Sequence, residues 1–271
     1  MSRLSDLVAI IERLRGPDGC PWDRAQNWHT MRPYLLEETY EVLDAVNGGA
    51  PEAVAEELGD LLFVVLLLVQ MGGDLESGAF SLEDVAGRIA DKMVRRHPHV
   101  FAADATPLAA PMGVQAWEDR KAQEGPGAQP RSRLAGVPRT LPALLRAHRQ
   151  SEKAATVGFD WPDARGVLDK VREELDELEE ALEAGDPAAV EHEYGDLLMA
   201  LGSLGGHLQV SPEDALQGAN DRFRDRFQRM ERLTWQRGSS LRELDDAGLD
   251  ALWNEAKAQL GRAPSPAPDG E

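Results

Sequence analysis

Cysteine is almost absent from this 271-residue chain, in which Cys20 is the only one. One thiol can neither form an internal disulfide nor supply the pair of thiolates of a structural zinc site, so a reducing compartment is expected. Positive charge is also scarce, because 29 Lys and Arg stand against 48 Asp and Glu, a net charge of −19. Nucleic-acid binding draws most of its affinity from basic side chains set against phosphates, so no nucleic-acid partner is expected.

Long apolar segments are missing as well. The longest, Leu61 to Val69, is much shorter than the about 20 residues that a bilayer-spanning helix requires. The first 14 residues carry two arginines and two acidic residues among their apolar ones, which is typical of an amphipathic helix and not of a signal peptide. We therefore expect a soluble cytoplasmic protein without a membrane partner.

No segment shows the alternation and β-branched enrichment of a strand, so we expect an all-α fold. Hydrophobic spacing and helix-end residues predict helices over 4–14, 31–46, 51–71, 81–96, 141–157, 167–184, 188–209 and 211–235, with a last one around 252–257. Cys20 to Asp23 is predicted to be a loop. The expected organisation is a tandem repeat of two four- or five-helix bundles, 1–101 and 139–260, with a linker containing a short helix at 102–138 and a disordered tail at 261–271.

One carboxylate pattern occurs twice, 136 residues apart. Leu36 to Glu41 and Glu56 to Asp60 recur in register as Arg172 to Glu177 and His192 to Asp196. Carboxylates three positions apart share a helix face, and a tight turn can bring two such helices together as antiparallel neighbours. Four carboxylates converging beside an apolar helix repel one another and lose hydration unless cations compensate. All-oxygen ligands favour a hard divalent ion, which is Mg²⁺, or Mn²⁺ as an alternative.

A Glu-rich helix in an acidic protein is often just a solvated face, but two features favour a site here. The pattern is duplicated in register, and Gly59 and Gly195 stand in mid-helix, where Gly costs about 1 kcal/mol relative to Ala. A glycine at that position in both copies indicates that another group approaches closely. No histidine follows a glutamate by three positions, which disfavours a di-iron bundle, and a phosphate-binding Gly-x-x-x-x-Gly-Lys loop is also missing.

Four segments resemble MazG, a family of nucleoside triphosphate pyrophosphohydrolases of an all-α superfamily. They read Leu-Glu-Glu-Thr-Tyr-Glu, Glu-Leu-Gly-Asp-Leu-Leu, Arg-Arg-His-Pro-His-Val-Phe and Val-Gly-Phe-Asp-Trp, and the likeness extends from about residue 4 to residue 260. The resemblance implies Mg²⁺-dependent hydrolysis of a nucleoside triphosphate to a monophosphate and pyrophosphate, a housecleaning activity on the nucleotide pool. It also implies a homodimer whose bundles share helices between subunits.

The resemblance further implies which residues act. In the second half the metal ligands fall on Glu174, Glu177, Glu193 and Asp196, and Glu173 is a candidate general base or orienting residue. The ATP or other nucleotide would be bound by Lys170, Arg222, Arg226, Trp253 and Lys257. The first half offers a candidate second site made of Glu38, Glu41, Glu57, Asp60, Lys92, Arg96, Trp117 and Lys121. In two-copy members the second half is generally catalytic, and we expect the same here.

Two positions depart from the family pattern, and two other functions stay open. Arg222 stands where the family usually has Lys, and His192 stands where it more often has an acid. One alternative is a narrower enzyme that acts on dUTP or phosphoribosyl-ATP. The other is a non-catalytic helical module that binds a nucleotide or a partner protein, which predicts Mg²⁺-independent binding and no pyrophosphate.

Overall fold

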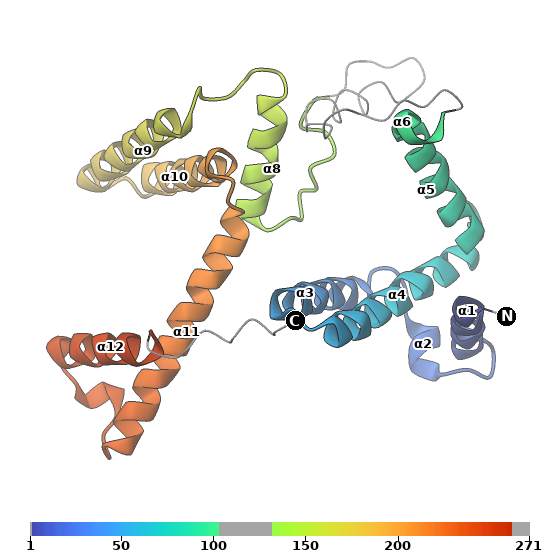
Figure 1. Cartoon of the computed structure of the whole chain (residues 1–271), viewed down its shortest axis with the longest axis horizontal. Helices are drawn as coiled ribbons and strands as arrows, with labels where there is room; N and C mark the ends of the chain where they lie inside the picture. Colours follow the sequence, from blue (N-terminus) through green and yellow to red (C-terminus); the bar gives the residue numbers. More distant parts are fainter. Residues whose placement is uncertain (1, 103–131, 262–271) are drawn as a thin grey trace, which may run out of the picture. The chain divides into compact units, whose positions relative to one another are not determined.

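The computed structural model describes residues 2–102 and 132–261, which contain helices and no strand (Figure 1). The all-α prediction is therefore confirmed for this part of the chain. Two compact units divide the chain, residues 1–111 and residues 112–271. Most of the predicted linker, with Trp117 and Lys121, lies outside the described residues, as does the tail after residue 261. None of the described helices is long and apolar enough to cross a membrane.

The first unit consists of six helices in its described part. They are α1 (Arg3–Arg15), α2 (Pro21–Ala25), α3 (Arg32–Gly48), α4 (Pro51–Gly73), α5 (Leu82–Arg96) and α6 (Pro98–Phe101). The four long ones match the predicted ranges closely. Ser81 and Asp84, whose spacing of three is typical of a helix start, form a reciprocal cap at the start of α5. The loop predicted at Cys20 to Asp23 is wrong, because Pro21 begins the short helix α2.

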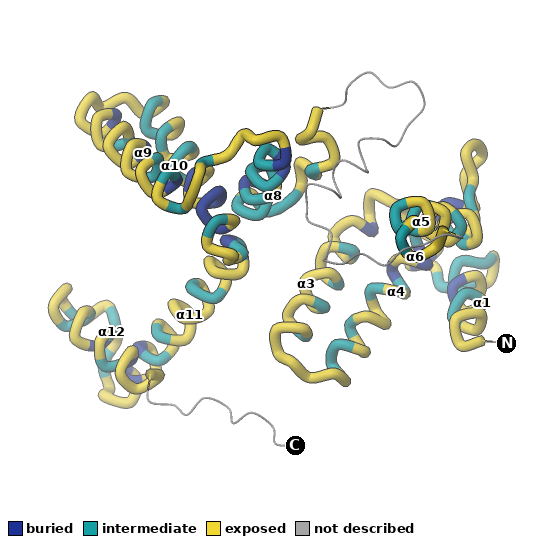
Figure 2. Tube along the Cα trace, turned by 45° about the horizontal axis from the view of Figure 1, so that its top comes forward, coloured by how far each residue is buried: buried dark blue, intermediate teal, exposed yellow. Residues whose placement is uncertain are grey.

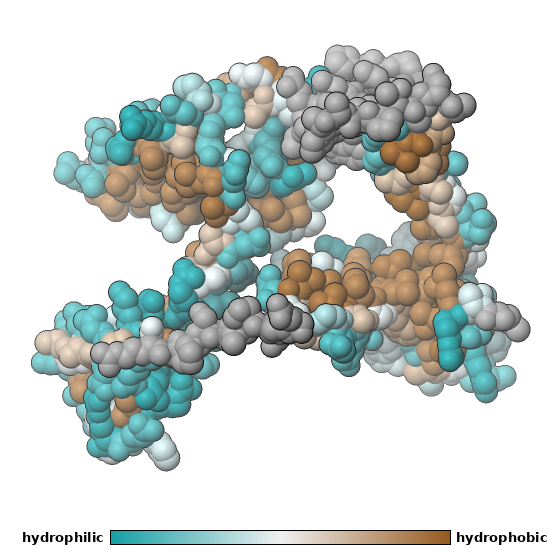
Figure 3. Space-filling view, viewed as in Figure 1, coloured by the Kyte–Doolittle hydropathy of each residue, from teal (hydrophilic) through white to brown (hydrophobic). Residues whose placement is uncertain are grey.

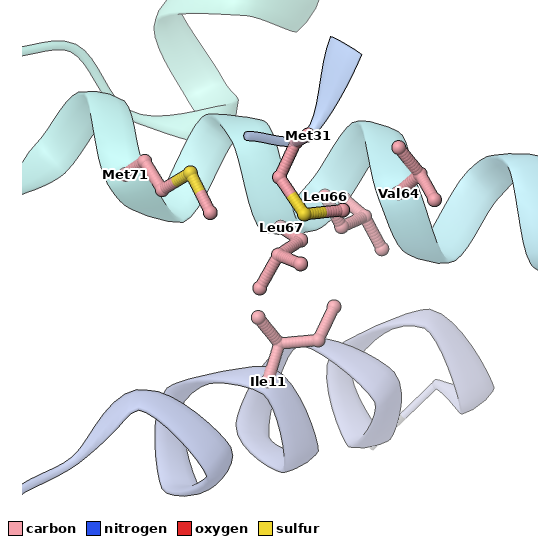
Figure 4. Packing of buried hydrophobic residues seen from close by; sticks show 6 residues of the cluster. All are labelled: Ile11, Met31, Val64, Leu66, Leu67 and Met71. Atoms are coloured by element: carbon pink, nitrogen blue, oxygen red, sulfur yellow. The ribbon is translucent and has the colours of Figure 1, made fainter. Parts of the chain in front are cut away.

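The core of the first unit lies where α1 crosses α4. Ile11 of α1 points at Leu67 of α4, and Met31, just before α3, closes the cluster (Figure 4). The apolar segment of α4 is only partly covered, since Leu62 is 40% exposed and Val65 is 38% exposed. Because Leu61 to Val69 is apolar on every side of a helix, protein is expected all around it, and the described residues of one chain provide only part of that cover.

The second unit holds α8 (Ala143–Ala155), α9 (Ala164–Ala184), α10 (Pro187–Leu208), α11 (Pro212–Gln236), the 3-10 helix η1 (Leu241–Glu243) and α12 (Asp246–Leu260). Helix α10 packs between α8 and α9, and α12 packs on α11 (Figures 1 and 2). Gly202 allows the α8 contact, because a Cβ there would lie 2.8 Å from the Cβ of Ala147. A separate cluster of Met230, Leu233, Leu252 and Ala256 holds α12 on α11.

A tight turn joins α9 to α10. Gly185 ends α9 at φ 66°, in the left-handed region that favours glycine. Asp186 then caps α10 by accepting hydrogen bonds from the backbone N–H groups of Ala188 and Ala189, at 3.0 and 3.3 Å. Pro187 occupies the first turn, where its missing N–H costs nothing. These residues make α9 and α10 antiparallel neighbours.

Candidate active site

Three carboxylates of the second unit converge across the α9–α10 pair. Glu174 and Glu177 come from α9 and Glu193 comes from α10, and one oxygen of each lies within 4.8 Å of the others. Asp196, one turn further along α10, stands outside this triplet. Its Oδ2 lies 3.3 Å from Nδ1 of His192. Glu174 and Asp196 both line one cavity of about 750 Å³ beside the helix pair.

Glu174 is the buried member of the triplet, with 4% of its surface exposed. Its Oε1 lies 2.7 Å from Nζ of Lys170, one turn earlier on α9. Its Oε2 is buried and has no hydrogen-bond partner in the described part of the chain. A buried carboxylate oxygen without a partner is costly, so this position calls for a cation or a donor.

Lys170 neutralises part of the cluster's negative charge. Its Nζ lies 2.7 Å from Oε1 of Glu173 as well as 2.7 Å from Glu174. The hydrogen bonds with Glu173 and Glu174 raise the pKa of Lys170 well above its ordinary value, so it stays charged. Glu173 is thereby held by the lysine, and it does not belong to the converging triplet.

The pKa of Glu177 is raised above its ordinary value. Partial desolvation is the first cause, and the negative charge of Glu174 is the second. The second cause means that the charge of Glu174 repels that of Glu177 in the absence of a cation. A set of all-oxygen ligands with an unsatisfied buried oxygen fits a hard divalent ion.

The first unit repeats this arrangement between α3 and α4. Glu38, Glu41 and Glu57 also have one oxygen each within 4.8 Å of the others. Desolvation first, and then the charge of Glu41, raise the pKa of Glu38 and of Glu57, and the charge of Asp60 adds to both shifts. The position equivalent to Lys170 is occupied here by Tyr34, so this cluster has no lysine of that kind.

The predicted nucleotide-binding residues of the second unit lie on other helices. Arg222 and Arg226 belong to α11, and Trp253 and Lys257 belong to α12. Trp253 packs on the α11–α12 cluster, with its ring centroid 5.5 Å from that of Phe223 and 5.6 Å from the guanidinium carbon of Arg226. These four residues are not among those that line the carboxylate cavity, whereas Lys170 is.

The first-unit basic residues Lys92 and Arg96 both lie on α5. Arg96 stands in the last turn of that helix.

The expected close approach to the mid-helix glycines is not seen among the residues that the structure describes. A Cβ added at Gly59 or at Gly195 would meet no atom within 4 Å. A role for these two glycines therefore requires something outside the described part of the chain.

The sequence did not reveal the aromatic segment between α8 and α9. Phe159 and Trp161 line the carboxylate cavity together with Val157 and Met199. Two aromatic residues inside a Gly- and Pro-containing loop were the available signal, because loops of that composition rarely need large apolar side chains. In the sequence, Val-Gly-Phe-Asp-Trp contributes to the family resemblance and carries no predicted role.

A domain-family profile and several individual proteins match the chain. The profile of the MazG nucleotide pyrophosphohydrolase domain matches residues 26–101. The chain is 43% identical over 252 residues to the nucleoside triphosphate pyrophosphohydrolase/pyrophosphatase MazG of Thermotoga maritima, an alignment that covers 93% of this chain and 94% of that protein. It is 42% identical over 262 residues to the nucleoside triphosphate pyrophosphohydrolase of Escherichia coli K12, covering 96% and 98%. A similar protein of Mycolicibacterium smegmatis, with the same name, is 37% identical over 157 residues, 58% of this chain and 47% of that one.

Proposed function

This chain belongs to the MazG nucleotide pyrophosphohydrolase family, and we propose that it hydrolyses nucleoside triphosphates to nucleoside monophosphate and pyrophosphate. Two relatives that match over more than nine tenths of both chains carry that activity in their names. We assign the reaction to the carboxylate cluster between α9 and α10. The observation that carries this assignment is the buried Oε2 of Glu174, which has no partner in the described chain and lies beside two further carboxylates.

Mg²⁺ is the cofactor we propose, and Mn²⁺ is its closest substitute among hard ions. Glu174, Glu177 and Glu193 would hold it, with Asp196 at the same cavity. When bound, such an ion supplies neutralising charge to the phosphates and an activated water. Lys170 holds one oxygen of Glu174 and leaves the other for the ion.

Glu173 acts as an orienting residue in this proposal. Its carboxylate lies 2.7 Å from Nζ of Lys170, and that same ammonium group contacts Glu174. Glu173 thus fixes the lysine, and the lysine fixes the buried carboxylate. This arrangement supports the second of the two roles expected for Glu173 and leaves the general base unassigned.

A homodimer would bring the basic residues to the carboxylates. Within one chain, Arg222, Arg226, Trp253 and Lys257 do not line the carboxylate cavity. Large apolar side chains are exposed on α9 and α10, where Figure 3 shows hydrophobic surface, and they include Leu175, Leu182, Leu198 and Leu201. Contiguous exposed apolar surface marks an interaction site. We propose that helices of a second copy cover this surface and complete the bundle, with their basic residues facing the triphosphate.

We further propose that the chain is a tandem repeat of two MazG units, of which the second is catalytic. The support is the carboxylate triplet of the first unit, Glu38, Glu41 and Glu57. These positions lie 136 residues before the triplet of the second unit. Lys170 distinguishes the catalytic copy, because the equivalent residue is Tyr34. The first unit would hold a divalent ion without that lysine.

A pyrophosphate-release panel over canonical and modified nucleoside triphosphates tests this function. The full chain should release pyrophosphate from several nucleotides with Mg²⁺, more weakly with Mn²⁺, and not with EDTA. Turnover of dUTP or of phosphoribosyl-ATP alone would show that the chain is the narrower enzyme. Nucleotide binding that persists in EDTA, without release of pyrophosphate, would show that it is the non-catalytic module.

A further inference from the structure

The cavity beside the carboxylates is lined by apolar as well as charged side chains. Its volume is about 750 Å³, within the range of small-molecule sites. Lys170, Glu174 and Asp196 line it together with Val157, Phe159, Trp161 and Met199. A pocket lined by both charged and apolar side chains suits a ligand with a charged end and a flat, weakly polar end.

We propose that the apolar residues of this lining receive the base and sugar of the nucleotide, with Phe159 and Trp161 as the aromatic wall and His207 as the residue that positions that wall. The inference rests on the proposed function, because a triphosphate bound at the carboxylates carries its nucleoside into the adjoining space. Aromatic side chains bind bases by stacking, which every base can provide. The occupant we infer is the nucleoside of the substrate and not a second copy of the chain, because the cavity is continuous with Glu174 and Asp196.

Among the uncharged polar residues of the cavity, Gln150 and not the two serines is available to a nucleoside. The hydroxyls of Ser151 and Ser203 lie 2.6 Å apart. They also donate to the backbone oxygens of Ala147 at 3.1 Å and Met199 at 3.0 Å, respectively. These three contacts share the two hydroxyl hydrogens, so the serines have no further hydrogen to donate to a ligand. Gln150 adds an amide at the same cavity, which can both donate to and accept from a base or a ribose hydroxyl.

The aromatic wall is tied to the end of α10. Nε2 of His207 lies 3.0 Å from Oδ1 of Asp160, and that oxygen also accepts a hydrogen bond from the backbone N–H of Trp161 at 2.8 Å. The His207 side chain is only 16% exposed. Gly158, at φ 82°, makes the turn that leads into this segment. His207 therefore fixes a three-residue segment whose first and last members are the two aromatic residues.

Two variants and a matched control test the site. Phe159→Ala removes an aromatic ring that is 81% exposed, so its folding cost should be small. Trp235→Ala is the control, because Trp235 is also 81% exposed and does not line the cavity. His207→Gln tests the positioning role. Steady-state turnover of ATP with Mg²⁺, inhibition by inorganic tripolyphosphate and the oligomeric state are measured for each, with the full chain.

The nucleoside site predicts a rise in KM without a loss of kcat. Phe159→Ala should raise the KM for ATP about tenfold, the size of one lost stacking contact, and His207→Gln should raise it by a smaller factor. Inhibition by tripolyphosphate, which has no nucleoside, should stay as in the wild type for both variants, and Trp235→Ala should change neither quantity. An unchanged KM in Phe159→Ala would overturn the proposal, and so would a parallel loss of tripolyphosphate inhibition. A changed oligomeric state with an unchanged KM would indicate that a second copy of the chain occupies the cavity. Wild-type turnover reports on the proposed function separately.

Discussion

At the scale of single residues, burial distinguishes Glu174 from the other candidate glutamates of α9. Glu173, Glu174 and Glu177 all lie on α9, yet only Glu174 is buried, with Lys170 on one oxygen and nothing in the described chain on the other. Helical spacing places Glu174 and Glu177 on one face, whereas Glu173 was a candidate only through the family resemblance. Their unequal burial depends on how α10 packs over α9, which spacing alone does not give.

The raised pKa of Glu177 predicts how the metal-free protein responds to pH. Partial desolvation and the charge of Glu174 raise the pKa of Glu177 above 4.5. A carboxyl group with a raised pKa binds its proton more readily in the folded than in the unfolded chain, so it contributes stability at low pH. That contribution should disappear as the pH rises from 4.5 through the raised value. With EDTA present, the wild type should therefore lose thermal stability relative to Glu177→Gln over this window.

Mg²⁺ should reverse this difference, because a bound cation favours the ionised carboxylate. Melting curves over a pH series, with EDTA and with Mg²⁺, provide the measurement. Glu183→Gln, an exposed position further along α9, is the control and should follow the wild type. A wild type that gains stability relative to Glu177→Gln as the pH rises in EDTA would contradict the account.

At the scale of elements, helix boundaries followed the local chemistry closely. Ser81 and Asp84 predicted the start of α5, and Gly185 with Pro187 predicted the break between α9 and α10, because capping and turn residues act within a few positions. The short helices α2 and α6 were missed, since four or five residues are too few to show a hydrophobic period. The aromatic segment at Phe159 to Trp161 needed the folded arrangement, because its neighbours at the cavity come from α8, α9 and α10.

Two glycines at the site should respond to alanine in opposite ways. Gly185 has a left-handed conformation at φ 66°, so Gly185→Ala should lower the stability by about 1 to 2 kcal/mol. The strained turn should also weaken Mg²⁺ binding, because it sets Glu193 opposite Glu174. Gly195 lies in mid-helix, and a Cβ added there would meet no atom of the described residues within 4 Å, so Gly195→Ala should raise the stability of α10 by about 1 kcal/mol.

Chemical denaturation and Mg²⁺ titration of both variants provide the measurement. A Gly185→Ala protein as stable as the wild type would argue against the left-handed conformation of residue 185. A Gly195→Ala protein that is destabilised, or that no longer forms the proposed dimer, would reveal a close neighbour at α10 from another chain.

At the scale of the whole molecule, the predicted metal ligands and the predicted nucleotide-binding residues of α11 and α12 form separate groups within one chain. The carboxylates lie between α9 and α10, while Arg226, Trp253 and Phe223 form their own contact group on α11 and α12. Leu62 and Val65 in the first unit, and Leu198 and Leu201 in the second, are apolar but exposed. The sequence already indicated this shortage of cover, because α4 is apolar on more than one face and a small bundle cannot bury all of it.

Complementation between inactive variants tests the proposed dimer. Glu174→Gln and the double variant Arg226→Ala, Lys257→Ala should each be inactive alone. If the two residue sets meet across subunits, mixed dimers contain one intact site, and equal co-expression should restore about a quarter of the wild-type turnover. Pyrophosphate release from the co-purified mixture is the readout. Mixtures that stay inactive although mixed dimers form would place both residue sets within one chain.

Pyrophosphate release by Glu174→Gln, compared with its first-unit equivalent Glu38→Gln, tests the central claim most directly. Both changes remove one charge with little change of shape, and both residues belong to a carboxylate triplet. The account predicts that Glu174→Gln lowers Mg²⁺-dependent turnover about 100-fold or more, with helix content and oligomeric state unchanged, and that Glu38→Gln turns over like the wild type. Unchanged turnover in Glu174→Gln, or loss of activity only in Glu38→Gln, would contradict it.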